Sequence, residues 1–166
     1  MAVSKKYRLE VLLKTRERDK KRAEEQLAKA IKALNDARKK EERLVAEKKK
    51  IHQAWVDKRQ EMRDRMDLGG FVGEGNRFVN FLRKLEEDEK AKQEEIDRQR
   101  EVIVQCEEKV TQCRRHYIDA AKALQVMEKH KGLWHKKLAH ELSRKEEREF
   151  DELGGIIHGR RQMSGM

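Results

Sequence analysis

The feature that most constrains the fold is an apolar repeat at alternating spacings of three and four residues. From Leu9, eleven of the seventeen repeat positions up to residue 65 are apolar, and from Phe78, fourteen of the eighteen up to Leu138 are apolar. A mean spacing of 3.5 residues keeps one stripe of a helix facing a partner helix in a left-handed coiled coil. The repeat therefore predicts two long helices that pack along a shared seam.

The composition leaves two fold classes open, and the repeat decides between them. The chain is 45% charged and 5% aromatic, contains no proline and carries a net charge of +10. Such a composition is typical of long helices and also of disordered chains, but a disordered chain has no reason to keep an apolar phase. No apolar run approaches the roughly 18 residues of a membrane span. We expect a soluble intracellular protein without direct membrane insertion.

Glycines mark the predicted ends of the two helices. Four of them crowd into residues 67–76, which predicts a loop at about 67–75 between a helix at about 5–66 and a second helix at about 76–153. Asn76 would be the N-cap of the second helix. Gly154 and Gly155 would end it, leaving a flexible tail at 154–166.

A short loop between two long helices favours antiparallel packing. The predicted fold class is all-α, a single elongated antiparallel coiled-coil hairpin over residues 1–166, with residue i opposite about 143 − i and Leu9 opposite Trp134. The second helix would then extend past the start of the first. After Leu138 the apolar phase changes, and the apolar residues continue as Leu142, Phe150, Leu153 and Ile157. An exposed apolar overhang of this kind indicates an interface.

Cysteine and histidine spacing gives no catalytic, metal or cofactor site. Cys106 and Cys113 are seven residues apart, about 10 Å along a helix, which is too far for a disulfide between them. They are interpreted as small buried seam residues, with a thiol cross-link between two copies as the alternative. His130, His135 and His140 recur every five residues, whereas zinc on a helix favours i, i+4 pairs.

The remaining patterns also give no enzymatic signature. The glycine-rich segment 69–75 lacks the Lys-Ser/Thr ending of a phosphate-binding loop and a preceding strand. No serine or cysteine nucleophile has a base placed beside it by spacing. We expect no catalytic residue, no cofactor, no metal and no small-molecule substrate.

A basic face on the first helix leaves three interpretations open. It is a solvated surface, a surface for an acidic protein groove, or a nucleic-acid site that binds phosphates. Glutamates are interspersed and aromatic residues are missing, so nucleic acid is the least favoured. The basic residues are Lys20, Lys21, Arg22, Arg38, Lys39, Lys40, Lys48, Lys49 and Lys50.

Three segments, in order along the chain, match a known pattern. They are Tyr7-Arg-Leu-Glu-Val-Leu-Leu-Lys-Thr-Arg16 followed by the Ala/Glu-rich 23–30, then Asn76-Arg-Phe-Val-Asn-Phe-Leu82, and finally His130-Lys-Gly-Leu-Trp134 with Glu146-Glu-Arg-Glu-Phe-Asp-Glu-Leu-Gly154 and Ile156-Ile-His158. Together these segments resemble the central stalk proteins of type III secretion, the FliJ/YscO family. The last segment is similar to the injectisome branch in particular.

The resemblance implies a function and a set of contact residues. Members of this family are two-helix coiled coils whose paired ends enter the hexameric secretion ATPase and promote its assembly and activity. They also contact the cytoplasmic ring of the export gate and escort secretion chaperones, in the cytoplasm at the base of the apparatus. The implied ATPase-binding residues are Tyr7, Leu9, Leu12, Leu13, Arg16, Arg144, Glu147, Arg148, Asp151 and Glu152. The implied gate-binding residues are Phe71, Phe78, Phe81 and Leu82.

Two other functions remain open at this point. The chain could be a structural coiled-coil scaffold or oligomerising adaptor without an ATPase partner, or a nucleic-acid-binding helical protein. The stalk interpretation expects a monomer when the protein is free, whereas the scaffold expects a dimer or a bundle.

Overall fold

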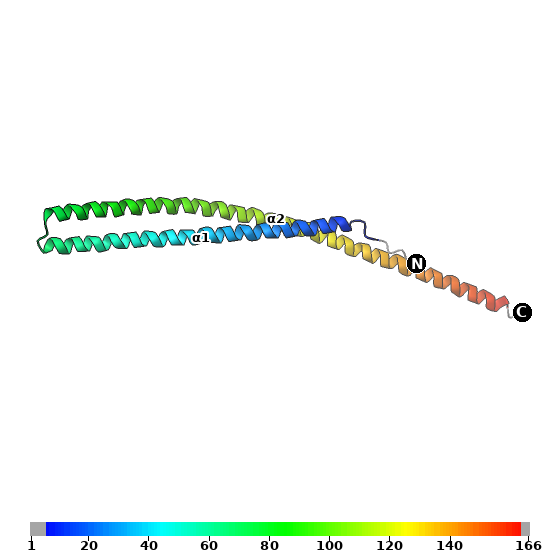
Figure 1. Ribbon diagram of the computed structural model, residues 1–166. Helices are drawn as coiled ribbons and strands as arrows, with labels where there is room; N and C mark the ends of the chain where they lie inside the picture. The colour runs from blue at the N-terminus through cyan, green and yellow to red at the C-terminus, as the bar shows by residue number, and fades with distance from the viewer. Residues whose placement is uncertain (1–5, 164–166) are drawn as a thin grey trace. The chain divides into compact units, whose positions relative to one another are not determined.

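A computed structural model of the chain describes residues 6–163, and its elements are two helices, α1 (Glu10–Asp67) and α2 (Val72–Met163), labelled in Figure 1. The helices contact each other, and the described residues contain no strand. The predicted all-α helical hairpin is confirmed. No helix among the described residues is long and apolar enough to cross a membrane.

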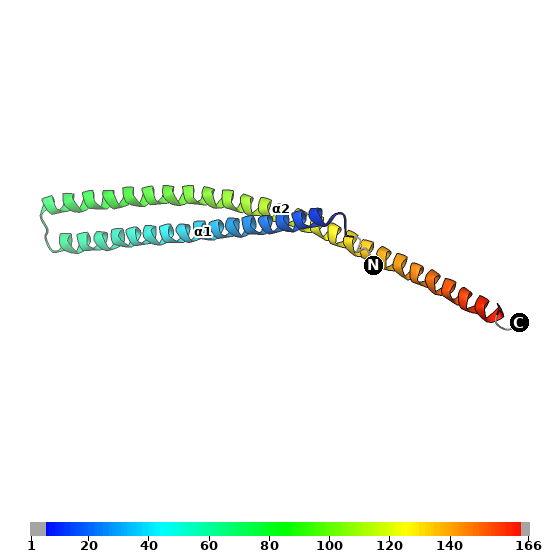
Figure 2. The same cartoon turned by 45° about the vertical axis from the view of Figure 1, so that its right-hand side comes forward.

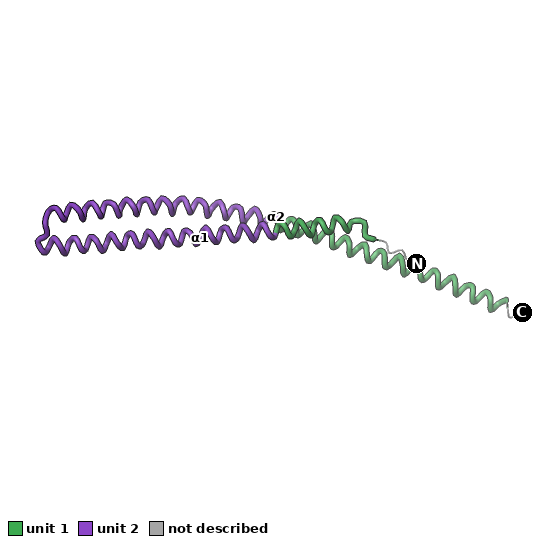
Figure 3. Tube along the Cα trace, in the orientation of Figure 1, with its two compact units in different colours: residues 1–23, 117–166 green, residues 24–116 purple. Residues whose placement is uncertain are grey.

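The chain divides into two compact units, coloured separately in Figure 3. Unit 1 consists of Met1–Ala23 and Tyr117–Met166, and unit 2 is Glu24–His116. In unit 2, α1 and α2 lie side by side and antiparallel, as Figures 1 and 2 both show. In unit 1, the first turns of α1 pair with α2 through contacts such as Glu10 with Lys131.

The predicted apolar stripes form the seam in both units. In α2, every position of the repeat from Phe78 to Leu138 is buried or half-buried, and in α1 the same holds from residue 20 to residue 62. Ile96 is the most enclosed, with 2% of its surface exposed. The core of unit 2 is a cluster of small and branched side chains, formed by Ala30, Leu34, Ala37, Ile103 and Val110. The periodicity of the sequence therefore identified the buried face correctly over these ranges, whereas Leu9, the first position of the predicted repeat, is 38% exposed.

Four polar residues interrupt the apolar repeat of α2, and each makes a bond to α1. The Gln99 amide donates to the backbone oxygen of Ala37 at 2.9 Å. The other three form ion pairs, namely Lys92 with Glu47 at 3.1 Å, Glu89 with Lys48 at 3.9 Å, and Lys131 with Glu10 at 2.8 Å. Glu89 is also hydrogen-bonded to Nδ1 of His52 at 3.3 Å. A polar seam residue has its partner in only one register, so these four select a single alignment of the helices.

The observed register differs by about two residues from the predicted one. Tyr7 contacts Trp134, Glu41 pairs with Arg100, and in each case the two residue numbers add up to 141 instead of 143. Tyr7, and not Leu9, therefore lies opposite Trp134. The cause is the connection between the helices, which spans only residues 68–71 and is shorter than predicted.

That connection is tight because two glycines close the end of α1. Gly69 has φ of 87°, in the left-handed region that favours glycine. The Gly70 N–H donates to the Arg65 oxygen and the Gly69 N–H to the Met66 oxygen, both at 3.1 Å, which is the Schellman pattern of helix termination. A Cβ on Gly70 would lie 3.0 Å from the Arg65 oxygen.

The second helix begins earlier than Asn76. The Phe71 oxygen accepts the first helical bond, from the Glu74 N–H at 2.9 Å, so Phe71 takes the N-cap position. The expectation that Asn76 is the N-cap is wrong, because Asn76 lies inside α2. At the other end of the hairpin, α1 begins at Glu10, whereas the sequence predicted a start at about residue 5.

Gly154 and Gly155 do not end α2, which continues to Met163. The predicted tail at 154–166 is therefore helical as far as Met163, and residues 164–166 lie outside the described residues. A glycine costs a helix about 1 kcal/mol relative to alanine, which a helix of 92 residues can absorb. Neither glycine adopts the positive φ of a C-cap, which among the described glycines is seen at Gly69.

Alanine substitutions at two glycines should change stability in opposite directions. Gly69→Ala forces a Cβ into left-handed backbone and should lower the free energy of unfolding by about 1–2 kcal/mol. Gly132→Ala, inside α2 with open space around the added Cβ, should raise it by up to about 1 kcal/mol. Urea unfolding followed by circular dichroism measures both changes, and equal effects would contradict the assigned role of Gly69.

Candidate interaction surfaces

Aromatic packing fastens Tyr7, which precedes α1, to α2 in unit 1. Tyr7 is 7% exposed, and its ring lies 5.4 Å from that of Trp134 at an interplanar angle of 56°. Such tilted ring pairs are favourable. The Tyr7 hydroxyl is hydrogen-bonded to Nδ1 of His130 at 2.5 Å. Tyr7 thereby holds residues 6–9 against the second helix.

An ion pair reinforces this contact one turn further on. The Lys131 ammonium lies 2.8 Å from a carboxylate oxygen of Glu10. This hydrogen bond is the main reason why the pKa of Glu10 lies below its usual value. The Glu10 N–H also donates to the Tyr7 oxygen at 3.2 Å, which closes the turn that leads into α1.

The first group of implied ATPase-binding residues splits into buried and exposed members. Tyr7 and Leu13 (5% exposed) face α2, so they hold the segment in place. Leu9 and Leu12 remain more than a third exposed. Arg16 is also exposed and lies 3.9 Å from Asp19. Leu9, Leu12 and Arg16 are therefore the members of this group that are available to a partner.

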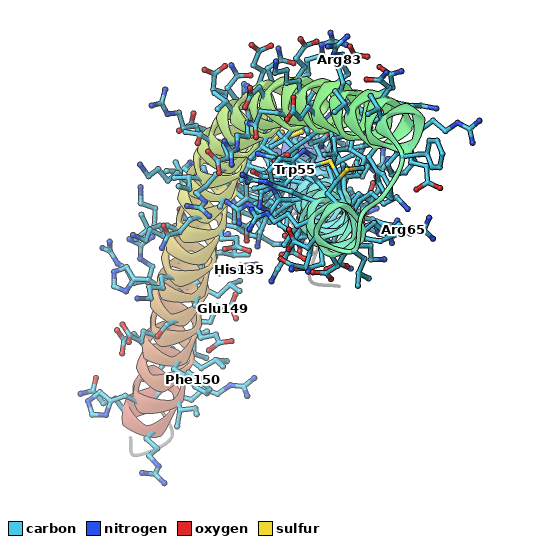
Figure 4. All side chains as sticks on the ribbon, turned by 90° about the vertical axis from the view of Figure 1, so that its left-hand side faces the viewer. Trp55, Arg65, Arg83, His135, Glu149 and Phe150 are labelled. Atoms are coloured by element: carbon cyan, nitrogen blue, oxygen red, sulfur yellow. The ribbon has the colours of Figure 1, made fainter. Side chains whose placement is uncertain are left out.

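The second group lies on the last part of α2. Every residue from 141 to 163 is exposed, including Arg144, Glu147, Arg148, Asp151 and Glu152. Large apolar side chains share this stretch and are also exposed, namely Leu142, Phe150, Leu153, Ile156 and Ile157. Figure 4 shows Glu149 and Phe150 projecting from the helix there. All ten implied residues thus belong to unit 1, the first group paired with α2 and the second a few turns beyond Leu138 on the same helix.

A basic groove of about 560 Å³ in unit 1 was missed by the sequence reasoning. Its apolar lining comes from Val11, Trp134 and Leu138, and its basic lining includes Arg8 and Lys131. The repeat identified Trp134 and Leu138 as seam residues. It could not show that the seam opens here, because the opening depends on where α1 begins.

The implied gate-binding residues lie at and just after the connection in unit 2. Phe71 is 83% exposed and Phe81 is 46% exposed, whereas Phe78 is buried and Leu82 is half-buried. The Lys58 ammonium lies 5.1 Å from the ring centre of Phe78 and 5.6 Å from that of Phe81. These are cation–π distances. Phe78 is thus mainly a packing residue, while Phe71 and Phe81 are available to a partner.

Charged residues surround these aromatic rings. Arg65 and Glu74 face each other across the connection at 3.8 Å, and a groove of about 380 Å³ runs between Phe78 and Phe81 and these charges. Figure 4 shows Arg65 beside the connection and Trp55 between the two helices. Lys58, Arg65 and Arg77 line this groove and were not among the implied contact residues. The sequence did not single them out, because the chain contains many other lysines and arginines.

Across residues 6–163, no three His, Cys, Asp or Glu side chains come together as a metal site would require. What the two surfaces present is exposed apolar and aromatic side chains among charged ones, a combination suited to contacts with other proteins.

Comparison with known proteins places this fold in a family. Residues 4–164 match the family model of YscO-like proteins, so the chain belongs to the YscO-like family. This is the YscO/FliJ-like family of type III secretion that the ends and the connection resemble. No curated protein matches the sequence.

A solved structure supports the fold. It is that of a candidate YscO homologue, CT670 from Chlamydia trachomatis, with 20% sequence identity and a TM-score of 0.78. The match covers 95% of this chain and 98% of that one. At this identity, the likeness shows a shared fold.

The lowered pKa of Glu10 predicts a local effect of pH. Because the folded-state pKa lies below the unfolded value of about 4.3, pairing with Lys131 stabilises the start of α1 above that value. This stabilisation is lost as the pH falls through the folded-state pKa. Amide exchange of residues 10–13, corrected for intrinsic rates, should therefore accelerate on acidification by about twofold to fivefold, the scale of an exposed ion pair.

In the Glu10→Gln variant, the amides of residues 10–13 should already exchange faster at neutral pH. Their exchange should not accelerate further on acidification. Glu17→Gln, an exposed residue on the same helix, is the matched control and should keep the acceleration. An acceleration that persists in Glu10→Gln would show that another group titrates.

Proposed function

We propose that this protein is a non-catalytic central stalk of a type III secretion system of the injectisome branch. Its paired ends bind the hexameric secretion ATPase in the cytoplasm at the base of the apparatus and promote its assembly and activity. The connection between the helices binds the cytoplasmic ring of the export gate, and the protein escorts secretion chaperones. The observation that carries the proposal is the family match over residues 4–164.

The exposed stretch of α2 in unit 1 supports the ATPase contact. Apolar side chains such as Phe150, Leu153 and Ile157 are more than half exposed and alternate with charged residues. An exposed apolar stripe of this kind marks an interaction site. A stalk in a ring of ATPase subunits acts by binding some subunit conformations more tightly than others, which changes their populations. The apolar and the charged side chains together supply that discrimination, since apolar contacts give affinity and charges give specificity.

The exposure of Phe71 supports the gate contact. A phenylalanine that is 83% exposed, in the same unit as a groove lined by Phe78 and Phe81, fits an anchor that becomes buried on binding. The glycines on its N-terminal side end α1 sharply and so place Phe71 at the turn between the helices.

Charge reversal at Asp151 tests the ATPase contact. Asp151→Arg should reduce stimulation of ATP hydrolysis by the cognate hexamer by about tenfold, because a like charge would replace an attraction in a desolvated contact. Glu101→Arg is the control, since Glu101 is an exposed helical residue of α2 in unit 2. Equal stimulation by both variants, with unchanged helicity, would overturn the assignment.

Sedimentation of the free protein separates the stalk from a coiled-coil scaffold. A stalk should sediment as a monomer of 19.8 kDa. A stable dimer at micromolar concentration would favour the scaffold, in which the exposed face of α2 pairs with a second copy.

Truncation of the exposed aromatic ring tests the gate contact. Phe71→Ser should weaken binding to the isolated cytoplasmic domain of the gate by at least about 2 kcal/mol, the scale of an interface anchor. Val104→Ser, at a position 53% exposed in α2, is the control and should bind normally. Isothermal titration calorimetry measures both affinities, and normal binding by Phe71→Ser would contradict the contact.

A further inference from the structure

Unit 2 contains a groove of about 550 Å³ beside its core, and both cysteines of the chain line it. The opposite wall comes from Ala30 and Ala33 of α1. Because alanine side chains are short, they leave open space across from the thiols where larger residues would fill the seam. The groove is thus a consequence of one small seam residue, Ala30, with a second small residue, Ala33, beside it.

The two thiols are partly accessible from this groove. Cys106 and Cys113 are half-buried, and on their inner side they pack against the core cluster around Leu34 and Val110. Neither is in a disulfide. Seven residues of helix separate their Cα atoms by about 10 Å, which exceeds the span of a disulfide. The two cysteines therefore cannot oxidise to a bond with each other without unwinding α2.

The charge around the groove is positive. Lys109 lies three residues after Cys106 and four before Cys113, which places all three on one face of α2. Lys29 contributes a second ammonium from α1, and no acidic residue lines the groove. These two ammonium groups raise the local concentration of small anions and accelerate their encounter with the thiols.

We propose that Cys106 and Cys113 form mixed disulfides with a low-molecular-weight disulfide that carries carboxylates, of the glutathione disulfide class. A cysteine thiol first loses its proton to solvent, and the thiolate attacks one sulfur of the incoming disulfide. A new S–S bond forms to the protein as the original S–S bond breaks. The other half leaves as a thiolate, which takes up a proton. The small disulfide is reduced as the cysteine is oxidised, so no further oxidant is needed.

The adduct stays until an external thiol removes it. Because the neighbouring cysteine is out of disulfide range, it cannot displace the adduct within the protein. The carboxylates of the adduct would lie beside Lys29 and Lys109, and its bulk would occupy the space opposite Ala30 and Ala33. The modification therefore adds a charged peptide at the edge of the core of unit 2.

The test compares two disulfides of opposite charge, oxidised glutathione and cystamine, on the full chain. Intact-mass spectrometry follows the rate of adduct formation, and Cys106→Ser and Cys113→Ser assign the sites. Oxidised glutathione should react about tenfold faster than cystamine, the lower end of electrostatic steering. The preference should shrink as salt rises from about 0.05 M to 0.5 M.

Charge reversal at the two lysines provides the specific control. The double variant Lys29→Glu with Lys109→Glu should lose or invert the preference, and both positions are exposed, so the helices should form normally by circular dichroism. The matched variant Lys49→Glu with Lys50→Glu carries the same change in net charge at exposed positions of α1, and should keep the preference.

Three results would overturn the proposal. The first is an equal rate for the two disulfides, and the second is a preference that Lys49→Glu with Lys50→Glu reduces as much as the groove variant does. The third is the formation of disulfide-linked protein dimers in place of small adducts. Each would show that the groove does not select an anionic disulfide.

Discussion

Each unit depends on a seam, in which apolar side chains spaced by three and four residues keep α1 and α2 in contact. Burial along the seam supplies the attraction, since each enclosed branched side chain contributes roughly 1.5–3 kcal/mol. Apolar contacts alone would permit neighbouring registers, because one heptad resembles the next. Gln99, Lys92, Glu89 and Lys131 remove that freedom, because each finds its partner on α1 in a single alignment.

Each candidate interaction surface follows from where the seam of its own unit ends. In unit 1 it closes on the Tyr7–Trp134 ring pair, and α2 then continues as a helix with its apolar residues exposed. In unit 2 it ends at the Schellman turn of Gly69 and Gly70, which leaves Phe71 exposed between two helix ends. Exposed apolar groups are unfavourable in water, so their persistence in each unit supports the proposal that partners bind there.

The residues implied by the family resemblance divide according to this geometry. Tyr7, Leu13 and Phe78 are buried, so their substitution would disturb packing as well as any contact. Leu12, Asp151 and Phe71 are exposed and can meet a partner directly. A resemblance between sequences cannot make this distinction, because a motif preserves packing residues and contact residues alike.

The sequence by itself determined the helical hairpin and its buried face, because a 3,4 periodicity is a local property that any helix displays on one side. Residue 82 and residue 96 could be assigned to the seam in this way, and family membership followed from the order of three segments. Only the tertiary structure decided the register, the N-cap at Phe71 and the helical continuation through Gly154 and Gly155. The register and the N-cap depend on cross-helix bonds and on the geometry of a four-residue connection. The continuation of α2 depends on a glycine cost of only about 1 kcal/mol, which a long helix absorbs. The groove lined by the two cysteines was also visible only in the tertiary structure. It requires Ala30 and Ala33 of α1 to lie opposite Cys106 and Cys113 of α2.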